Sequence, residues 1–298
     1  MKIHTIDLEL MGTSGVVGAY LIPSSTGHIL VDCGPGATIQ KLYAGISRLG
    51  FETTDVKHLL LTHIHLDHAG AAGQLARELG LTVYVHKHGS SHLLRPERLI
   101  ESATRIYGTM MDVLWGTFEP VPENQLIILE GGETLNISGL EFQALYTPGH
   151  AIHHLAYFVN ESVFSGDVGG VRLQGANHVV APTPPPDIDF EVWHSSIQTL
   201  RKLEAKRILV SHYSEFSDVP SHLDALENNL NALEQLSLEV MRAGGGRDEI
   251  AEQIEKLLEQ AVSSDASLVS RYMLATPHLM AADGLVRYWQ RKRPEALL

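Results

Sequence analysis

The chain has little cysteine, comparatively few basic residues and no long hydrophobic run. Its 298 residues include a single cysteine, Cys33, so no disulfide can form within the chain. Acidic residues outnumber basic ones by 35 to 22, and the net charge of −13 disfavours nucleic acid and anionic membranes as partners. No apolar stretch approaches the length of a membrane span, and the first residues lack the apolar core of a signal peptide. We therefore expect a cytoplasmic protein without membrane association.

Histidine, in contrast, is abundant, with 17 residues. Three of them fall in the segment 62–68, Thr-His-Ile-His-Leu-Asp-His, which follows a run of leucines and precedes several small residues. This order predicts a buried strand, a turn and the start of a helix. Side chains alternate along an extended strand, so His63 and His65 point the same way, while Asp67 and His68 fall in the turn. Imidazole and carboxylate groups that face one point suit Zn²⁺, Mn²⁺ or Fe²⁺.

Three more side chains of the types that bind metals follow predicted strands further along the chain. They are His150, Asp167 and His212. Taken singly, each signal is weak, because a histidine or aspartate at the end of a strand is often only a turn residue. Active sites in α/β sheets favour the end of the strands at which such residues lie. We therefore treat all three as candidate ligands.

The remaining pattern alternates strands and helices up to about residue 215. A strand, a helix and a strand over 55–86 predict a parallel crossover unit. Short strands from 126 to 165 predict a second sheet. Between them, residues 87–122 have the apolar spacing of two helices separated near Pro96, which indicates a helical insertion beside the site.

The metal-ligand motifs together resemble the signature of the metallo-β-lactamase-fold hydrolases. In that superfamily an HxHxDH segment, here at 63–68, is followed by three further ligands in the order seen in this chain. The resemblance covers residues 1–215 and implies a catalytic domain of the α/β class, an αββα sandwich that carries the helical insertion. A C-terminal helical extension at 216–298 follows as an accessory region. It could cover the site or mediate self-association as a homodimer.

The resemblance also implies two metal ions, most simply Zn²⁺, with Fe or Mn as alternatives. It assigns His63, His65 and His150 to the first ion, Asp67, His68 and His212 to the second, and Asp167 as the bridge between them. The implied reaction is attack by a metal-bridging hydroxide on the carbonyl of a small ester, thioester or lactone. Asp67 is then the candidate catalytic residue, which orients the hydroxide or passes a proton to the leaving group.

Four further residues are weaker candidates for contact with the substrate. His154 lies either against the substrate or behind the ligands, with a structural role as the alternative. Arg172 would pair with a carboxylate or phosphate, or else form a surface salt bridge. Tyr213 would hydrogen-bond a tetrahedral intermediate. Tyr107 would line a pocket, or else pack the insertion on the domain.

The branch of the superfamily stays open between glyoxalase II-like and lactonase-like enzymes. True glyoxalase II carries a basic C-terminal motif, which the basic run at 287–293 matches poorly, and quorum-quenching lactonases share all seven ligands. The alternatives are a phosphodiesterase or nuclease of the same fold, disfavoured by the acidic balance, and a mononuclear iron persulfide dioxygenase. A non-catalytic, metal-stabilised binding protein is the alternative from another class. Metal content measured together with turnover distinguishes them.

Overall fold

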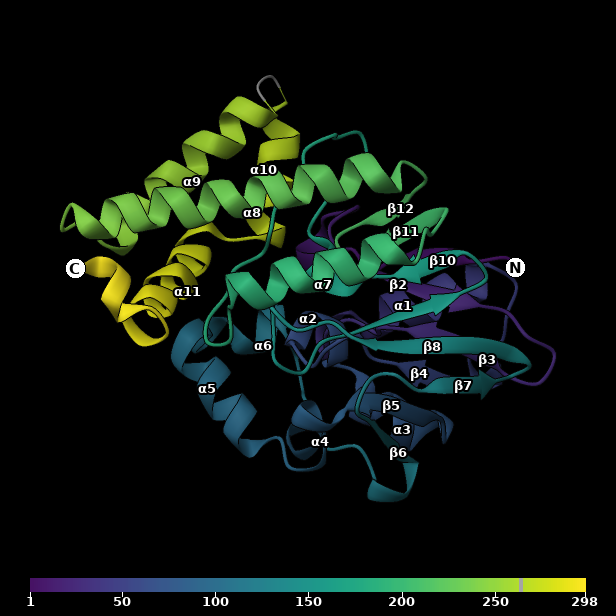
Figure 1. Ribbon diagram of the computed structural model, residues 1–298. Coiled ribbons are helices and arrows are strands. Elements are labelled where there is room, and N and C mark those ends of the chain that lie inside the picture. The colour runs from purple at the N-terminus through teal and green to yellow at the C-terminus, as the bar shows by residue number, and fades with distance from the viewer. Residues whose placement is uncertain (263–264) are drawn as a thin grey trace.

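The computed structural model describes residues 1–262 and 265–298 and packs two sheets face to face between outer layers of helices (Figure 1). The first sheet contains, in spatial order, β1 (His4–Asp7), β2 (Gly18–Ile22), β3 (His28–Val31), β4 (Val56–Leu60), β5 (Thr82–His86) and β6 (Leu126–Leu129). Its strands from β3 to β6 run parallel, so that their carboxyl ends lie along one edge. The predicted parallel crossover unit is thus present.

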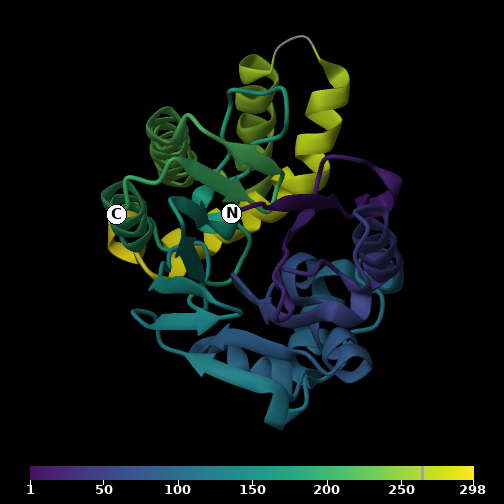
Figure 2. The same cartoon turned by 90° about the vertical axis from the view of Figure 1, so that its right-hand side faces the viewer.

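The second sheet comes from the later part of the chain. In spatial order it contains β12 (Ser214–Phe216), β11 (Arg207–Val210), β10 (Ser162–Phe164), β9 (Leu155–Val159), β8 (Leu140–Tyr146) and β7 (Thr134–Ile137). Most neighbours are antiparallel, and β10 pairs with β11 in parallel. Viewed from the side, the purple-to-blue strands lie on one side and the teal-to-green strands on the other (Figure 2).

The core between the sheets is built from the inward side chains of both. Tyr20 of the first sheet and Phe164 of the second are buried, with ring centroids 5.4 Å apart in an edge-to-face arrangement. Buried tyrosine hydroxyls need partners. Tyr20 donates to the carbonyl of Val210, and Tyr157 donates to the carbonyl of Leu61 at 2.9 Å. These bonds fix the two sheets to one another at the ends of β4 and β11, where ligand candidates follow.

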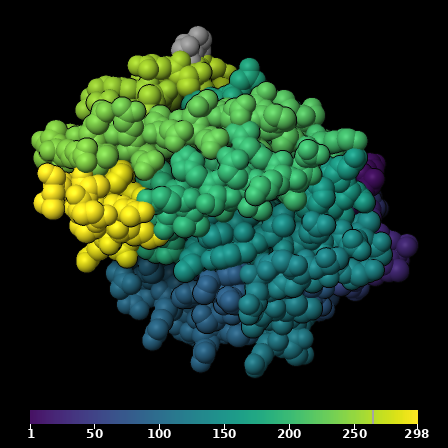
Figure 3. Space-filling model, in the orientation of Figure 1, coloured from purple at the N-terminus to yellow at the C-terminus, as the bar shows by residue number. Residues whose placement is uncertain are grey.

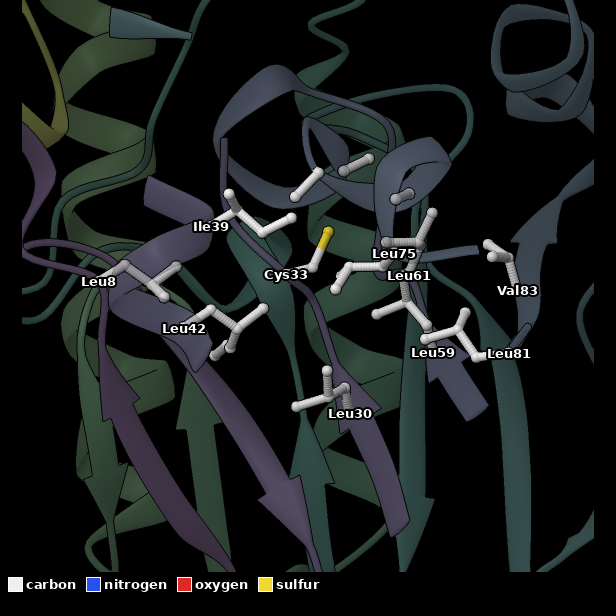
Figure 4. Packing of buried hydrophobic residues seen from close by; sticks show 14 of the residues in the cluster. Leu8, Leu30, Cys33, Ile39, Leu42, Leu59, Leu61, Leu75, Leu81 and Val83 are labelled. Carbon is white, nitrogen blue, oxygen red and sulfur yellow. The ribbon is translucent and has the colours of Figure 1, made fainter. Parts of the chain in front are cut away.

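Helices cover the outer face of each sheet. The first sheet is covered by α1 (Ile39–Arg48) and α3 (Ala72–Leu79), and the second by α7 (Phe190–Lys202). In α1 the buried residues Ile39, Leu42 and Ile46 recur at the three-to-four spacing of one helix face. Cys33 lies among these apolar side chains, fully buried (Figure 4). The predicted αββα sandwich is confirmed.

The helical insertion follows β5 and consists of α4 (Lys87–Leu94), α5 (Glu97–Tyr107) and α6 (Met111–Leu114). The break between α4 and α5 falls at Pro96, as the sequence predicts. Gly89 lets α4 approach the domain closely, because a Cβ there would lie 2.6 Å from Ile64 and 3.4 Å from His153. The insertion therefore packs directly against the loop that follows β4.

The C-terminal extension is helical, as expected, and contains α8 (Val219–Arg242), α9 (Arg247–Ala261), α10 (Ala266–Ala275) and α11 (His278–Arg291). We did not predict α10 as a separate helix. The extension packs on α7 through a shared apolar cluster, and α11 lies beside the insertion (Figures 1 and 3). None of the described helices combines the length and the apolar character that a membrane crossing requires.

Candidate metal centre

The histidine-rich segment lies at the carboxyl end of β4, at the centre of the parallel strands. The chain leaves the strand after Leu60, passes through His63 and His65, and enters the short helix α2 (Leu66–Ala69), which carries Asp67 and His68. This strand, turn and helix is the local structure that the sequence predicts. The side chains of His63 and His68 are completely buried. Burial of several imidazoles together calls for a partner that their nitrogen atoms can share.

Three imidazoles meet in a first cluster. The Nδ1 atom of His65 lies 2.9 Å from the Nε2 atom of His63 and 3.0 Å from the Nε2 atom of His150. His150 reaches this point from the loop after β8, about 85 residues further along the chain. The three nitrogen atoms lie close enough to share one cation.

A second cluster lies beside the first and joins α2 to the loop after β11. The Oδ2 atom of Asp67 lies 3.2 Å from Nε2 of His212 and 3.6 Å from Nε2 of His68. Potential ligand atoms of these three residues all lie within 4.8 Å of one another. One carboxylate and two imidazoles are a donor set that suits Zn²⁺, Mn²⁺ or Fe²⁺.

Asp167 lies between the two clusters and presents one oxygen to each. Its Oδ2 atom is 3.5 Å from Nε2 of His150 and 3.9 Å from Nε2 of His63. Its Oδ1 atom is 3.3 Å from Nε2 of His68 and 3.7 Å from Nε2 of His212. The structure thus brings together all seven side chains that the resemblance assigns to metal, with Asp167 in the middle.

Hydrogen bonds on the far side of each ring aim the inner nitrogen at the cluster. The Nδ1 atom of His150 donates to the carbonyl of Pro182 at 2.8 Å, and Nδ1 of His212 donates to the carbonyl of Val16 at 3.0 Å. The Nδ1 atom of His68 donates to the carboxylate of Asp32 at 2.9 Å. Each bond leaves Nε2 free to face inward, which is the arrangement that orients histidine ligands in metal sites.

Two atoms in the centre of the site show whether a cation fits. Nε2 of His68 and Oδ1 of Asp167 are buried and have no hydrogen-bond partner among the described residues. Polar atoms left in this way are costly unless another group satisfies them. The two atoms face one another at 3.3 Å, and the donor set around them is the one that a divalent cation requires. The residues present therefore fit a metal ion.

The charges of the site divide the histidines into two groups. Burial lowers the pKa of His150 to about 4, and burial together with neighbouring imidazoles lowers the pKa of His63 well below its usual range. Burial also opposes the charged form of His68 and of His212, but the carboxylates of Asp167 and Asp67 outweigh it and raise both pKa values. The first cluster therefore offers neutral imidazoles. A cation bound in the second cluster would instead replace the protons held by His68 and His212.

An apolar pocket of about 470 Å³ opens over the metal ligands. His65, Asp67, Asp167 and His212 line one part of it, so the candidate centre is accessible to a small molecule. Tyr107 also lines the pocket. Burial, with a smaller effect of the Asp67 carboxylate, raises the pKa of Tyr107, so its hydroxyl remains a neutral hydrogen-bond donor.

Two other candidates for substrate contact lie away from the pocket, which corrects those expectations. The Arg172 guanidinium is buried, donates to Asp218 at 2.9 Å and lies 4.1 Å from the centre of the Phe216 ring. It makes no contact with the pocket and forms a salt bridge, which was the alternative expectation, although its own side chain is buried and only Asp218 is exposed. The ring of Tyr213 does not line the pocket. It lies beside Gly18, where a Cβ would be 2.9 Å from the ring, and packs against the apolar cluster that contains Tyr272.

His154 is placed behind the ligands and does not line the pocket. Its Nδ1 atom is 2.9 Å from the hydroxyl of Thr147, its Nε2 atom accepts the N–H of Val168 at 3.3 Å, and its ring stacks on His63. With both nitrogens used, it supports the site and has no donor left for a substrate. Substrate contact by His154 is therefore also corrected. The adjacent His153, in contrast, lines the pocket.

Comparison with known proteins agrees with this geometry. A family model described as the metallo-beta-lactamase superfamily matches residues 12–212. A metallo-beta-lactamase fold-containing protein of Sulfurisphaera tokodaii is 29% identical over 247 residues, which cover 80% of this chain and 92% of that protein. The hydroxyacylglutathione hydrolase GloC of Haemophilus influenzae is 30% identical over 188 residues, covering 62% of this chain and 80% of that protein.

Solved structures give the same fold. A metallo-beta-lactamase family protein of Thermus thermophilus superimposes with a TM-score of 0.69 at 21% identity, covering 97% of this chain and 93% of that one. At this identity the likeness concerns the fold alone. The family match spans the sandwich from β2 to β11 and every ligand candidate from His63 to His212. The chain therefore belongs to the metallo-β-lactamase superfamily, a family of generally hydrolytic proteins.

Proposed function

We propose that this protein is a metal-dependent hydrolase that uses two divalent ions, most simply Zn²⁺, to cleave a small ester, thioester or lactone. The observation that carries the proposal is the convergence of seven ligand-type side chains beside an apolar pocket, with Asp167 between the two clusters. Ions held there would supply Lewis acidity and a nucleophile at neutral pH.

Two relatives support an acyl bond as the target. One is the hydroxyacylglutathione hydrolase, which is a hydrolase by name. The other is an atrochrysone carboxyl ACP thioesterase of Aspergillus fumigatus, 24% identical over 225 residues. This chain covers only 41% of the length of that thioesterase, so the likeness concerns the catalytic fold. Thioesters and oxygen esters are therefore the first bonds to test.

Asp67 is the carboxylate best placed to orient a nucleophile in the pocket. Its side chain is 20% exposed, against 5% for Asp167, and it lines the pocket. Burial raises the pKa of Asp67, but His68 and His212 outweigh burial and hold the pKa well below its usual range. Asp67 is therefore an ionised carboxylate, which could hold a cation together with His68 and His212 and accept a hydrogen bond that orients a nucleophilic water in the pocket.

The pocket favours an acyl substrate over a phosphodiester. Among the described residues that line it, Arg98 is the one side chain with a permanent positive charge, and most of the others are apolar. A nucleic acid needs several cationic contacts along its backbone. The lining together with the net charge of −13 therefore supports an uncharged reacting group.

The test is elemental analysis combined with a hydrolysis panel. Chelator-treated protein is reloaded with Zn²⁺, Mn²⁺ or Fe²⁺ and assayed on p-nitrophenyl esters, acyl thioesters, lactones and bis-p-nitrophenyl phosphate. We expect metal-dependent turnover of one acyl class. Turnover of the phosphodiester alone, or oxygen uptake with one iron per chain, would contradict the proposal. Bound metal without any turnover would leave a binding protein.

A further inference from the structure

One wall of the pocket over the metal ligands is formed by two segments that are far apart in the sequence. The insertion contributes Leu99, Ala103 and Tyr107 of α5, followed by Trp115. The C-terminal extension contributes Leu274 at the end of α10 and the start of α11. In Figure 1 α5 and α11 lie beside one another, and the C-terminal residues directly above the insertion are visible in Figure 3. The two accessory segments thus form one wall around the site.

This wall is held in place by direct contacts. The hydroxyl of Tyr107 donates to the sulfur of Met280 at 3.4 Å, which joins α5 to α11. The rings of Tyr107 and Trp115 lie edge to face with centroids 5.0 Å apart. Trp115 and Ala103 are buried in one apolar cluster with Leu66 of α2. The pocket is therefore shaped in advance, which lowers the entropic cost of binding a ligand there.

Apolar side chains lie directly beside the metal ligands in the pocket. Leu66 lies between the ligand candidates His65 and Asp67 and belongs to the same apolar cluster as Trp115. The candidate metal centre thus borders directly on an apolar part of the pocket, formed by Leu66, Leu99, Ala103 and Trp115, which we call the apolar chamber. A volume of about 470 Å³ falls in the range of sites for small molecules. A small molecule that fills the whole pocket would place a polar bond beside the metal-binding side chains and an apolar group in the apolar chamber.

We propose that this pocket binds an extended apolar acyl group, so that the substrates are medium-chain acyl esters or thioesters. The acyl linkage rests on the proposed function, whereas the apolar chain rests on the lining alone. Burial of a methylene group is favourable by about 0.8 kcal/mol, which corresponds to roughly fourfold in affinity for each added carbon. Selectivity for chain length is therefore the property that the pocket confers.

Binding can be tested without metal or turnover. The probes are 1-alkanols of four to ten carbons, which carry no charge and so avoid the unneutralised carboxylates of the metal-free site. Calorimetric titration into the chelator-treated full chain should give affinity that rises by up to about fourfold for each carbon. Affinity that does not change from butanol to decanol would overturn the proposal.

Matched variants test whether the binding takes place in this pocket. Met280→Trp fills the pocket from α11, and Leu279→Trp places the same ring at the adjacent residue, which is 41% exposed and does not line the pocket. We expect Met280→Trp to weaken decanol binding at least tenfold and Leu279→Trp to leave it unchanged. Equal effects of the two substitutions would overturn the proposal.

A second pair on α5 serves in case Met280→Trp does not fold. Ser102 is exposed and lines the pocket, whereas its exposed neighbour Glu101 does not. Ser102→Trp should weaken decanol binding, and Glu101→Trp should not. No difference between them would count against the proposal.

Hydrolysis by the zinc-loaded protein then separates the two proposals. If p-nitrophenyl acetate and decanoate are cleaved equally well and alkanols bind without regard to length, the chain-length inference fails and the hydrolase function stands. If no ester or thioester is cleaved but the alkanol series shows the expected rise, the apolar chamber stands and the hydrolase function fails.

Discussion

The Oδ2 atom of Asp32 lies 2.9 Å from the Nδ1 atom of His68, directly behind the second metal cluster. The same carboxylate accepts the backbone N–H of Thr62 at 2.8 Å and the hydroxyl of Ser211 at 2.8 Å. One buried side chain thus connects the loops after β3, β4 and β11, each of which carries or supports ligand candidates. The orientation of the ligand candidates therefore depends on the Asp32 carboxylate.

Asp32→Asn should weaken metal binding without unfolding the chain. Asparagine tolerates the left-handed backbone of this residue, whose φ is 55°, but its amide cannot accept from all the donors that the carboxylate serves. Loss of such a supporting partner typically costs about 10- to 100-fold in metal affinity. Competition with a chromogenic chelator measures the change. As a control, Ser211→Ala removes one donor to Asp32 and should have a smaller effect. Metal affinity equal to that of the parent in Asp32→Asn would show that Asp32 does not orient the ligands.

His65→Ala should remove most of the metal and activity while the sandwich stays folded. The imidazole lies within 3.0 Å of both other nitrogens in the first cluster, so its loss leaves that site with two ligands besides Asp167. We expect affinity to fall by more than about 100-fold, beyond the usual loss for supporting partners. Elemental analysis and circular dichroism measure the two outcomes. His194→Ala, on α7, is the control, and full turnover by His65→Ala would exclude the assigned site.

Arg172→Met should lower stability and leave the KM of the substrate unchanged. The guanidinium donates to the carbonyl of Ala176 at 2.9 Å and to Asp218, whose side chain is 49% exposed, so solvent screens that ion pair. We expect a loss of about 2 kcal/mol in the free energy of unfolding, from the buried hydrogen bonds of a charged group. Urea denaturation measures it. Arg105→Met, in an exposed pair with Glu101, should change stability by less than about 0.5 kcal/mol. A raised KM in Arg172→Met would restore a role in substrate binding.

His222 should make the metal-free protein less stable as the pH falls from about 6.5 to about 4. Burial lowers its pKa to about 4, and nearby Arg172 acts in the same direction, against the hydrogen bond to the carbonyl of Gly169. Between the folded pKa and the usual value of about 6.5, the unfolded chain binds the extra proton, so stability rises with pH. The contribution is at most about 3 kcal/mol.

His222→Gln keeps a side-chain donor near Gly169 but removes the titrating ring. Urea denaturation at several pH values between 4 and 7 should therefore show a shallower pH dependence for this variant than for the parent. His194→Gln, in a half-buried position on the surface of α7, should keep the parent slope. Identical slopes in parent and His222→Gln would show that this histidine does not carry the effect.

The sequence predicts the sandwich, and it points to the candidate ligands at the strand ends, because both depend on local patterns. The segment from His63 to His68 encodes its strand, turn and helix within a few residues, and His150, Asp167 and His212 each follow a recognisable strand. Their convergence follows once the strand ends are aligned by the sheets, which family resemblance supplied and periodicity alone did not.

Side-chain direction at single residues was harder to predict. His153 and His154 are neighbours just before β9, yet the first lines the pocket and the second lies behind the ligands. The backbone N–H of Arg172 bonds to the carbonyl of His212 at 2.8 Å, yet its side chain runs away toward Asp218. Which way such a side chain points depends on packing between distant elements.

The sequence left open whether the C-terminal extension covers the site or mediates self-association, and it did not show which residues of the extension meet the insertion. Met280 lies 173 residues from Tyr107, and nothing in the apolar spacing of α11 distinguishes a face that lines a pocket from a face that packs on the core. The contact between the insertion and the C-terminal extension is visible only when both are placed on the sandwich.

Calorimetric titration of Zn²⁺ into the chelator-treated protein measures directly whether the seven side chains form a site for two divalent ions. We expect each chain to bind two ions and His65→Ala to lose tight binding of at least one. A protein that binds no Zn²⁺, or that binds it equally well with His65 replaced, would show that these side chains do not form such a site.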